Sequence, residues 1–145
     1  MTVTSRRKAA PKRVDWASLR RAASAARRRA YAPYSKFRVG AALLGEDGRV
    51  FTGANVENAS YGLSLCAERS AIAAAIAAGV RRFAAIAIAS DGARPATPCG
   101  QCRQVLAEFP PSFPVLCFTP RGDEVHSDVR TLLPQGFGPS YLGRR

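Results

Sequence analysis

Long apolar runs and histidine are both scarce in this chain of 145 residues. No stretch of roughly 18 consecutive apolar residues occurs, so no membrane-spanning helix is expected. The positively charged N-terminal stretch is not followed by the apolar segment of a secretory signal, which favours a cytoplasmic protein. The one histidine, His126, follows a turn among polar residues and is expected at the surface rather than at a metal.

Acidic residues are scarce too: there are ten, against 22 lysines and arginines. The imbalance lies in residues 1–38, where twelve basic residues and the single acid Asp15 give a net charge of +11. Residues 39–145 hold ten basic and nine acidic residues, a net charge of +1. We interpret residues 1–13 as a flexible basic tail and residues 14–145 as one domain. The first basic cluster contains no aromatic residue that could stack on bases, so a nucleic-acid partner is not favoured.

The apolar spacing and the turn residues predict an α/β fold. The expected helices cover residues 15–29, 66–78, 99–109 and 129–133, and the expected strands cover residues 37–44, 50–55, 83–90, 115–118 and 125–127. This order is typical of a mixed five-stranded sheet between two helical layers, a three-layer α-β-α sandwich. The helix over residues 66–78 is apolar nearly all round, so we expect it to be buried or shared with another subunit.

Two short motifs carry the chemistry: Cys66-Ala67-Glu68 and, downstream, Pro98-Cys99-Gly100-Gln101-Cys102. Cys99 and Cys102 are three residues apart and share one face of a helix, whereas Cys66 and Glu68 can address one metal only if Cys66 lies at or before the first helical turn. Three thiolates can bind zinc and leave a fourth position open, which distinguishes a catalytic from a structural site. Glu68 is then free to move protons.

Other assignments of the cysteines stay open at this point. A Cys-x-x-Cys pair is also typical of redox sites and zinc knuckles, and Cys117 could complete a four-cysteine site. Cys117 lies in an apolar stretch, which favours a core position, and a structural site has no use for Glu68. Three thiolates would leave zinc with a net charge of −1, for which Arg69 is the first candidate partner and Arg103 the second.

Several stretches of the chain resemble the small homotetrameric zinc-dependent cytidine deaminases. The first zinc ligand is Cys where the general zinc-deaminase signature has His. The resemblance covers roughly residues 15–142. It rests on Tyr34–Ala41 (YSKFRVGA), Gly53–Gly62 (GANVENASYG), Cys66–Arg69 (CAER), Pro98–Gln104 (PCGQCRQ), and the triplets LLP and FGP at residues 132–134 and 137–139.

The resemblance implies hydrolytic deamination of free cytidine and 2′-deoxycytidine, a reaction of pyrimidine salvage. It implies one zinc ion per subunit, held by Cys66, Cys99 and Cys102. Glu68 would take a proton from water, protonate N3 of the cytosine ring and help ammonia leave.

The resemblance also implies roles in substrate binding. Asn55 and Glu57 would hydrogen-bond a ribose hydroxyl, the 3′-hydroxyl, and Phe37 would wall the pocket near the base. The backbone N–H of Ala67 and the carbonyl groups near Ser64 and Pro98 would address the pyrimidine edge. The active sites of a homotetramer would be shared, with Tyr61 and Phe137 coming from neighbouring subunits and Phe137 stacking on the base.

Three other functions compete with this interpretation. Aminonucleoside-antibiotic deaminases of the blasticidin type share the Cys-x-Glu and Pro-Cys-x-x-Cys pattern but lack the glutamate at position 57. A deaminase of bases in nucleic acids could use the basic N-terminal segment, but a grip on the 3′-hydroxyl blocks chain continuation. A non-enzymatic zinc module that binds nucleic acid would have no use for Glu68.

Overall fold

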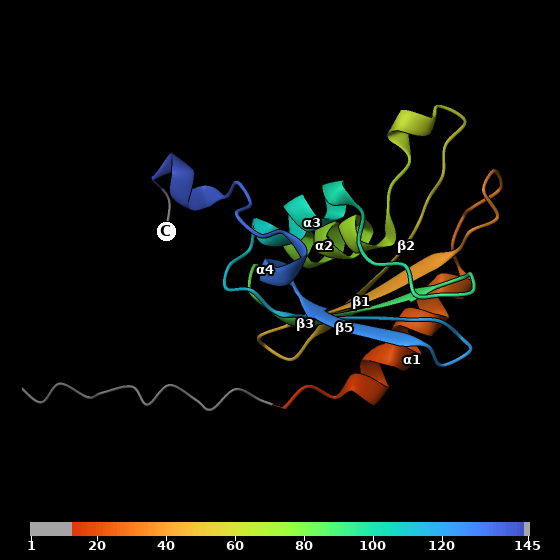
Figure 1. The fold of residues 1–145 in the computed structure, drawn as a ribbon, viewed down its shortest axis with the longest axis horizontal. Helices are drawn as coiled ribbons and strands as arrows, with labels where there is room; N and C mark the ends of the chain where they lie inside the picture. The colour runs from red at the N-terminus through yellow and green to blue at the C-terminus, as the bar shows by residue number, and fades with distance from the viewer. Residues whose placement is uncertain (1–12, 144–145) are drawn as a thin grey trace, which may run out of the picture.

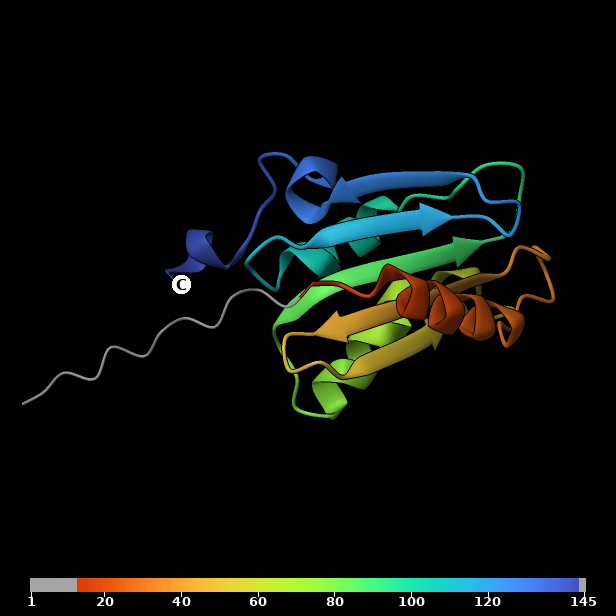
Figure 2. The same cartoon turned by 90° about the horizontal axis from the view of Figure 1, so that it is seen from below.

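The computed structural model describes residues 13–143 and has three layers (Figure 1). A five-stranded sheet in the order β2-β1-β3-β4-β5 forms the middle layer. Helix α1 crosses one face of the sheet, while α2 and α3 lie on the other (Figure 2). The elements are α1 (Trp16–Arg28), β1 (Val39–Gly45), β2 (Val50–Ala54), α2 (Ala67–Ala77), β3 (Phe83–Ser90), α3 (Gly100–Ala107), β4 (Pro114–Phe118), β5 (Glu124–Asp128) and α4 (Val129–Leu132). The predicted three-layer fold is confirmed.

The strand directions bring the starts of α2 and α3 to one edge of the sheet. β2 and β3 both pair antiparallel with β1, so they run in the same direction and end at the same edge. α2 follows β2 in the chain and α3 follows β3, so both helices begin at that edge. β4 pairs parallel with β3, as a crossover through α3 allows.

Helix α1 packs directly on the backbone of β1. Asp15 caps the helix by accepting a hydrogen bond from the Ser18 N–H (3.1 Å), as predicted. The buried face of α1 carries Leu19 and Ala23. A Cβ atom at Gly40 of β1 would come within 2.2 Å of the Ala23 carbonyl oxygen. The absence of a side chain at this position therefore lets the helix lie close to the sheet.

Helix α2 approaches the opposite face in the same way. A Cβ atom at Gly53 of β2 would lie 2.4 Å from the Ala67 carbonyl oxygen and 2.4 Å from the Ala71 nitrogen. The outer side of α2 is also apolar but exposed; its exposed residues are Ala73, Ala74, Ile76 and Ala77. The helix predicted to be apolar all round is thus only half covered by its own chain.

Some boundaries differ from the predicted ones. α2 and α3 begin just after Cys66 and Cys99, which are extended N-cap residues instead of first helical residues. The 3-10 turns Tyr61–Leu63 and Pro139–Leu142 were not expected, because such short turns have no apolar period that a sequence could reveal. The predicted tail falls almost wholly on residues outside the described ones and stays a prediction. No helix within residues 13–143 is long and apolar enough to cross a membrane.

Candidate metal centre and active site

Three cysteine side chains converge where α2 and α3 begin. Their sulfur atoms all lie within 4.8 Å of one another, and the Sγ atoms of Cys66 and Cys99 are 3.9 Å apart. Sulfur atoms that share a tetrahedral zinc ion at about 2.3 Å lie roughly 3.8 Å from one another. Within residues 13–143, Cys66, Cys99 and Cys102 form the one cluster of this kind. The soft donor set and its spacing therefore fit zinc.

The backbone at the two helix starts explains this convergence. Cys66 (φ −73°, ψ 155°) and Cys99 (φ −66°, ψ 169°) are extended, and Cys102 follows in the first turn of α3. Because Cys66 precedes the helix, it is not held to the helical phase that would turn it away from Glu68. The sequence spacing required Cys66 to lie at or before the first helical turn if it and Glu68 are to face one metal ion, and Cys66 does so. Helix N-termini also carry partial positive charge, which favours thiolates.

Glu68 lies buried next to the sulfur cluster, with only 5% of its surface exposed. The Cys102 thiol donates to its Oε2 atom across 3.6 Å. Burial raises the pKa of the Glu68 carboxyl above its ordinary value, and the nearby Cys66 thiolate raises it further. A carboxyl with a raised pKa keeps its proton to a higher pH than an ordinary one does, which suits a group that accepts and donates protons.

Arg69 contacts the first cysteine of the cluster. Its Nη2 atom lies 3.4 Å from Cys66 Sγ and 3.3 Å from the Ser64 carbonyl oxygen. The Cys102 thiol and the Arg69 guanidinium lower the pKa of Cys66 to about 5. The pKa of Cys102 moves up instead, because the neighbouring Cys66 sulfur and burial both favour the protonated thiol. Cys66 therefore ionises before Cys102 when no metal is bound.

Arg103 does not act as a partner of the cysteine sulfurs, contrary to the sequence-based suggestion. Its Nε atom donates to the Pro98 carbonyl (2.7 Å), and its two Nη atoms donate to the Leu132 carbonyl (3.0 Å) and the Thr97 hydroxyl (3.1 Å). Arg103 thus ties the loop before α3 to the end of α4. The sequence could not show this, because Leu132 is distant in the chain.

Cys117 and His126 take the places expected of them. Cys117 is 2% exposed and packs in the core between the sheet and α2. Burial raises the pKa of its thiol to about 12. His126 is exposed and its Nε2 atom lies 2.9 Å from a carboxylate oxygen of Glu124. Neither belongs to the cysteine cluster.

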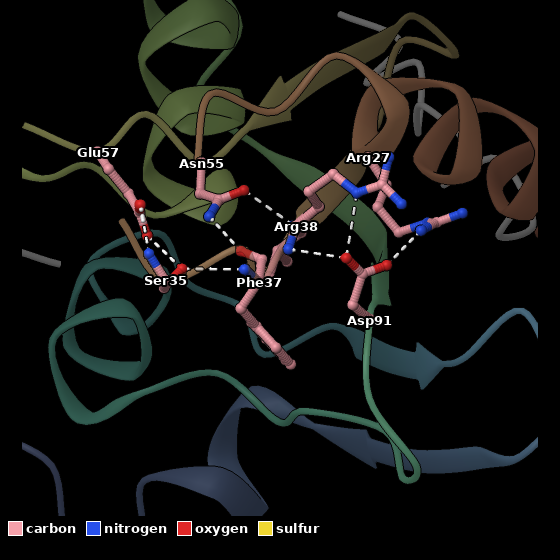
Figure 3. A network of polar contacts seen from close by, with 8 residues as sticks. Arg27, Ser35, Phe37, Arg38, Asn55, Glu57 and Asp91 are labelled. Atoms are coloured by element: carbon pink, nitrogen blue, oxygen red, sulfur yellow. Dashed lines mark hydrogen bonds and ion pairs between the residues drawn. The ribbon is translucent and has the colours of Figure 1, made fainter. Parts of the chain in front are cut away.

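Asn55 holds the start of β1 with both ends of its amide (Figure 3). Its Oδ1 atom accepts from the Val39 N–H (2.8 Å) and its Nδ2 atom donates to the Phe37 carbonyl (2.8 Å). The Phe37 carbonyl thus bonds to a side chain, and β1 begins at Val39 instead of the predicted Phe37.

The Glu57 carboxylate holds the turn at Tyr34 and Ser35, which precedes β1. Its carboxylate accepts from the backbone N–H groups of both residues (3.0 Å each) and from the Ser35 hydroxyl (Figure 3). The Ser35 hydroxyl and N–H hold the pKa of Glu57 below its ordinary value. Glu57 therefore stays ionised as it orders this turn.

An ion-pair network fixes the segment from its other side (Figure 3). Asp91 follows β3, accepts from the Arg38 backbone N–H and Nε (3.1 Å each), and pairs with Arg27 of α1. Partial burial alone would raise the pKa of Asp91, but the donors of Arg38 and Arg27 hold it below its usual value. The segment of residues 34–39 is thus held from two sides, by Asn55 and Glu57 and by Asp91.

The three aromatic residues predicted for the pocket are all exposed. Phe37 is 38% exposed, Tyr61 73% and Phe137 56%. The Tyr61 ring meets Tyr34 edge-on, with the ring centroids 5.7 Å apart. Phe137 stacks on Tyr141 instead, at 5.1 Å. The yellow-green turn Tyr61–Leu63 and the blue segment after α4 leave the body at different places (Figure 1).

A hollow of about 300 Å³ lies beside the turn that Glu57 holds. It is lined by Tyr34, Ser35, Glu57, Tyr61 and Ser64. Glu57 and Tyr61 were predicted at the substrate, whereas Tyr34 and Ser35 were not given a role. Their only signal in the sequence is that they belong to a stretch with a family resemblance.

The backbone groups predicted to face the pyrimidine edge lie beside the cysteines. Ala67 is buried and is the first residue of α2, where an N–H has no partner within its helix. The carbonyl oxygens of Ser64 and Pro98 accept from Arg69 and Arg103, respectively. Each carbonyl oxygen has a second lone pair that can accept another hydrogen bond.

Comparisons with known proteins agree with this geometry. Residues 15–116 match the family described as the cytidine and deoxycytidylate deaminase zinc-binding region. A cytidine deaminase of Sporosarcina psychrophila is 49% identical over 118 residues, which cover 81% of this chain and 87% of that protein. A cytidine deaminase of Mycobacterium tuberculosis is 45% identical over 131 residues, which cover 90% of this chain and 96% of that protein.

Solved structures show the same arrangement of the chain. The crystal structure of a cytidine deaminase from Burkholderia pseudomallei superimposes with a TM-score of 0.82 at 50% sequence identity. The match covers 86% of this chain and 100% of that chain. The likeness therefore extends over nearly the whole of the described structure.

Proposed function

We propose, because the chain belongs to the cytidine and deoxycytidylate deaminase zinc-binding family, that it hydrolyses free cytidine and 2′-deoxycytidine to uridine and 2′-deoxyuridine with release of ammonia. The observation that carries the proposal is a buried carboxyl next to three clustered thiols: Glu68 Oε2 lies 3.6 Å from Cys102 Sγ. A structural zinc site has no use for such a group. The same contact argues against a non-enzymatic zinc module.

Cys66, Cys99 and Cys102 would hold the zinc, which when bound supplies a Lewis acid that makes water more acidic. Three thiolates weaken that Lewis acidity by their negative charge. Arg69 would offset part of it, since its guanidinium lies 3.4 Å from Cys66 Sγ.

Glu68 would carry the protons. As a carboxylate it would accept a proton from the attacking water, and as a carboxylic acid it would deliver that proton to N3 of the cytosine ring. The same carboxylate would then take the proton of the hydroxyl group added at C4 and deliver it to the amino group, so that the C4–N bond breaks, ammonia leaves and the C4 carbonyl of uridine forms. A pKa raised by burial suits both roles, because the carboxyl then gains a proton more readily than an ordinary glutamate does.

Asn55 and Glu57 would bind the ribose, although each already has partners within the chain. The Asn55 amide uses one of its two N–H donors, and the Glu57 carboxylate uses three of about four acceptor sites. One sugar hydroxyl could therefore accept from Asn55 and donate to Glu57. A phosphate at that hydroxyl would meet the Glu57 charge, which favours a free nucleoside over a nucleic acid.

We further propose a homotetramer with shared active sites. The exposed apolar side of α2 around Ile76 offers a surface for another subunit, and Tyr61 and Phe137 are free to reach a neighbour's pocket. Phe37 would wall the pocket from within the chain. All four cysteines are free thiols, which suits a reducing cytoplasm. We propose that the reaction serves pyrimidine salvage in that compartment.

The test is the loss of cytidine absorbance in the ultraviolet with purified protein. We expect turnover of cytidine and deoxycytidine that stops when zinc is chelated and returns when zinc is added. Blasticidin and a single-stranded oligonucleotide that contains cytosine serve as competing substrates. Faster turnover of either would favour the corresponding rival function over ours.

Glu68→Gln tests the proton transfers. We expect kcat/KM for cytidine to fall about 10²- to 10⁴-fold or more, with the zinc content per chain unchanged. Glu108→Gln, the same exchange at an exposed position after α3, serves as the control and should keep full activity. Unchanged deamination by Glu68→Gln would refute this mechanism.

A further inference from the structure

Helix α3 contacts the C-terminal segment through two consecutive residues. Arg103 donates to the Leu132 carbonyl at the end of α4 (3.0 Å). Gln104 donates from Nε2 to the Phe137 carbonyl (2.8 Å). The chain between these points, residues 133–136, turns through the positive φ of Gln135 (57°). The segment is thus held at both ends by the helix that carries Cys102 and begins just after Cys99.

The hydrogen bond from Gln104 holds the outer part of this segment, residues 134–143. Among the described residues, no other hydrogen bond joins residues 134–143 to the rest of the chain. Phe137 and Tyr141 stack on each other, with the ring planes 23° apart, and both are more than half exposed. The aromatic pair therefore depends on the Gln104 hydrogen bond for its position relative to α3. The backbone of this segment extends away from the body of the molecule after α4 (Figure 1).

We infer that Gln104 is a positioning residue for substrate binding: it aims Phe137 at the active site of a neighbouring subunit. The inference rests on the proposed function, in which Phe137 acts in the pocket of another chain. Gln104 does not touch the reacting atoms and lies on the exposed side of α3. Without the bond, Phe137 would have to be ordered when substrate binds, and the entropy of that ordering would weaken binding.

Gln104→Glu removes the donor with almost no change of shape, and it sets a carboxylate against the Phe137 carbonyl. Weaker ordering of Phe137 affects the ground state and the transition state alike, because the base is stacked in both. We therefore expect KM for cytidine to rise about threefold to tenfold while kcat changes less than twofold. The zinc content and the oligomeric state should not change.

Gln135→Glu is the matched control. It makes the same exchange and adds the same charge to the segment itself, but the Gln135 side chain forms no hydrogen bond with any residue between 13 and 143. Its KM should stay at the wild-type value. A wild-type KM for Gln104→Glu, or a loss of zinc from it, would overturn the inference.

Mixed oligomers test whether Gln104 affects the active site of a neighbouring subunit or that of its own. Wild-type chains are co-expressed with an excess of chains that carry both Glu68→Gln and Gln104→Glu, so that all active sites capable of turnover have a wild-type Gln104 in their own chain. A raised KM in these oligomers supports action on a neighbour, whereas a wild-type KM overturns it. Oligomers with Glu68→Gln chains alone provide the reference.

These results are separable from the failure of the proposed function. If wild-type protein loaded with zinc does not deaminate cytidine, the proposed function fails. If it does and Gln104→Glu leaves KM unchanged, only the positioning role fails.

Discussion

Arg69 and Arg103 show how alike two residues can look in the sequence and how differently they act. Each lies within one helical turn of a clustered cysteine. Arg69 follows the N-cap Cys66 by three residues, so the first turn of α2 brings its guanidinium back to that sulfur. Arg103 points instead to three oxygen acceptors, including one on α4. Only the partners from other parts of the chain distinguish the two.

Arg69→Gln should weaken zinc binding without unfolding the protein. Loss of the guanidinium removes a cation that lowers the pKa of Cys66 and offsets thiolate charge, so we expect the zinc dissociation constant to rise about 10- to 100-fold. Competition with a chromophoric chelator measures this constant. Arg81→Gln, an exposed arginine beyond α2, is the control and should bind zinc as the wild type does. Equal zinc affinity in the two variants would contradict the role given to Arg69.

The structure gives Asn55 and Glu57 a second role, which is to hold another segment of their own chain in place. The sequence, through its family resemblance, predicts contacts to a ribose hydroxyl. The structure adds that both side chains order residues 34–39, a segment that supplies Tyr34 of the hollow and Phe37, which we propose as a wall of the pocket. Substitution of either residue would therefore disturb this segment as well as the proposed sugar contact.

At the scale of elements, two glycines let the helices lie on the sheet. Gly40 and Gly53 belong to neighbouring strands and face opposite layers, one beneath α1 and the other beneath α2. In each case a Cβ atom would meet helix backbone, which cannot swing aside as a flexible side chain can. The helices must then move away from the strands.

Gly40→Ala and Gly53→Ala should each reduce the free energy of unfolding, by about 1 to 3 kcal/mol or more, because overpacking displaces a helix. Urea denaturation followed by circular dichroism gives this energy. Gly62→Ala is the control, since a Cβ atom there meets nothing within 4 Å. A loss of stability as large for Gly62→Ala would mean that the close approach is not the cause.

At the scale of the whole molecule, charge and chemistry belong to different parts of the chain. Of the net charge of +12, +11 comes from residues 1–38, whereas all the cysteines lie later. We propose that residues 1–13 are dispensable and that residues 14–145 form the catalytic domain. The cap of α1, Asp15, lies after the proposed boundary.

Deletion of residues 1–13 should leave kcat/KM for cytidine within about twofold of the full chain, because none of the motifs that predict the site lies in them. The ultraviolet assay measures this, with the melting temperature of both proteins as the check on folding. A collapse of turnover in a folded, shortened protein would show that the tail takes part in the active site.

The sequence by itself determined which cysteines cluster and the order of the elements, and it predicted Glu68 as the proton carrier. These depend on residue type and on spacing along the chain: Cys66 and Glu68 at one helix start, Cys99 and Cys102 at another, and apolar periods between turns. The tertiary structure decided what depends on partners far apart in the chain. It placed Arg69 on a thiol and Arg103 on carbonyls, gave Asn55 and Glu57 their internal contacts, and tied Phe137 to α3. Hydrogen bonds between distant segments exist only after the strands have brought those segments together, so no local pattern could have revealed them.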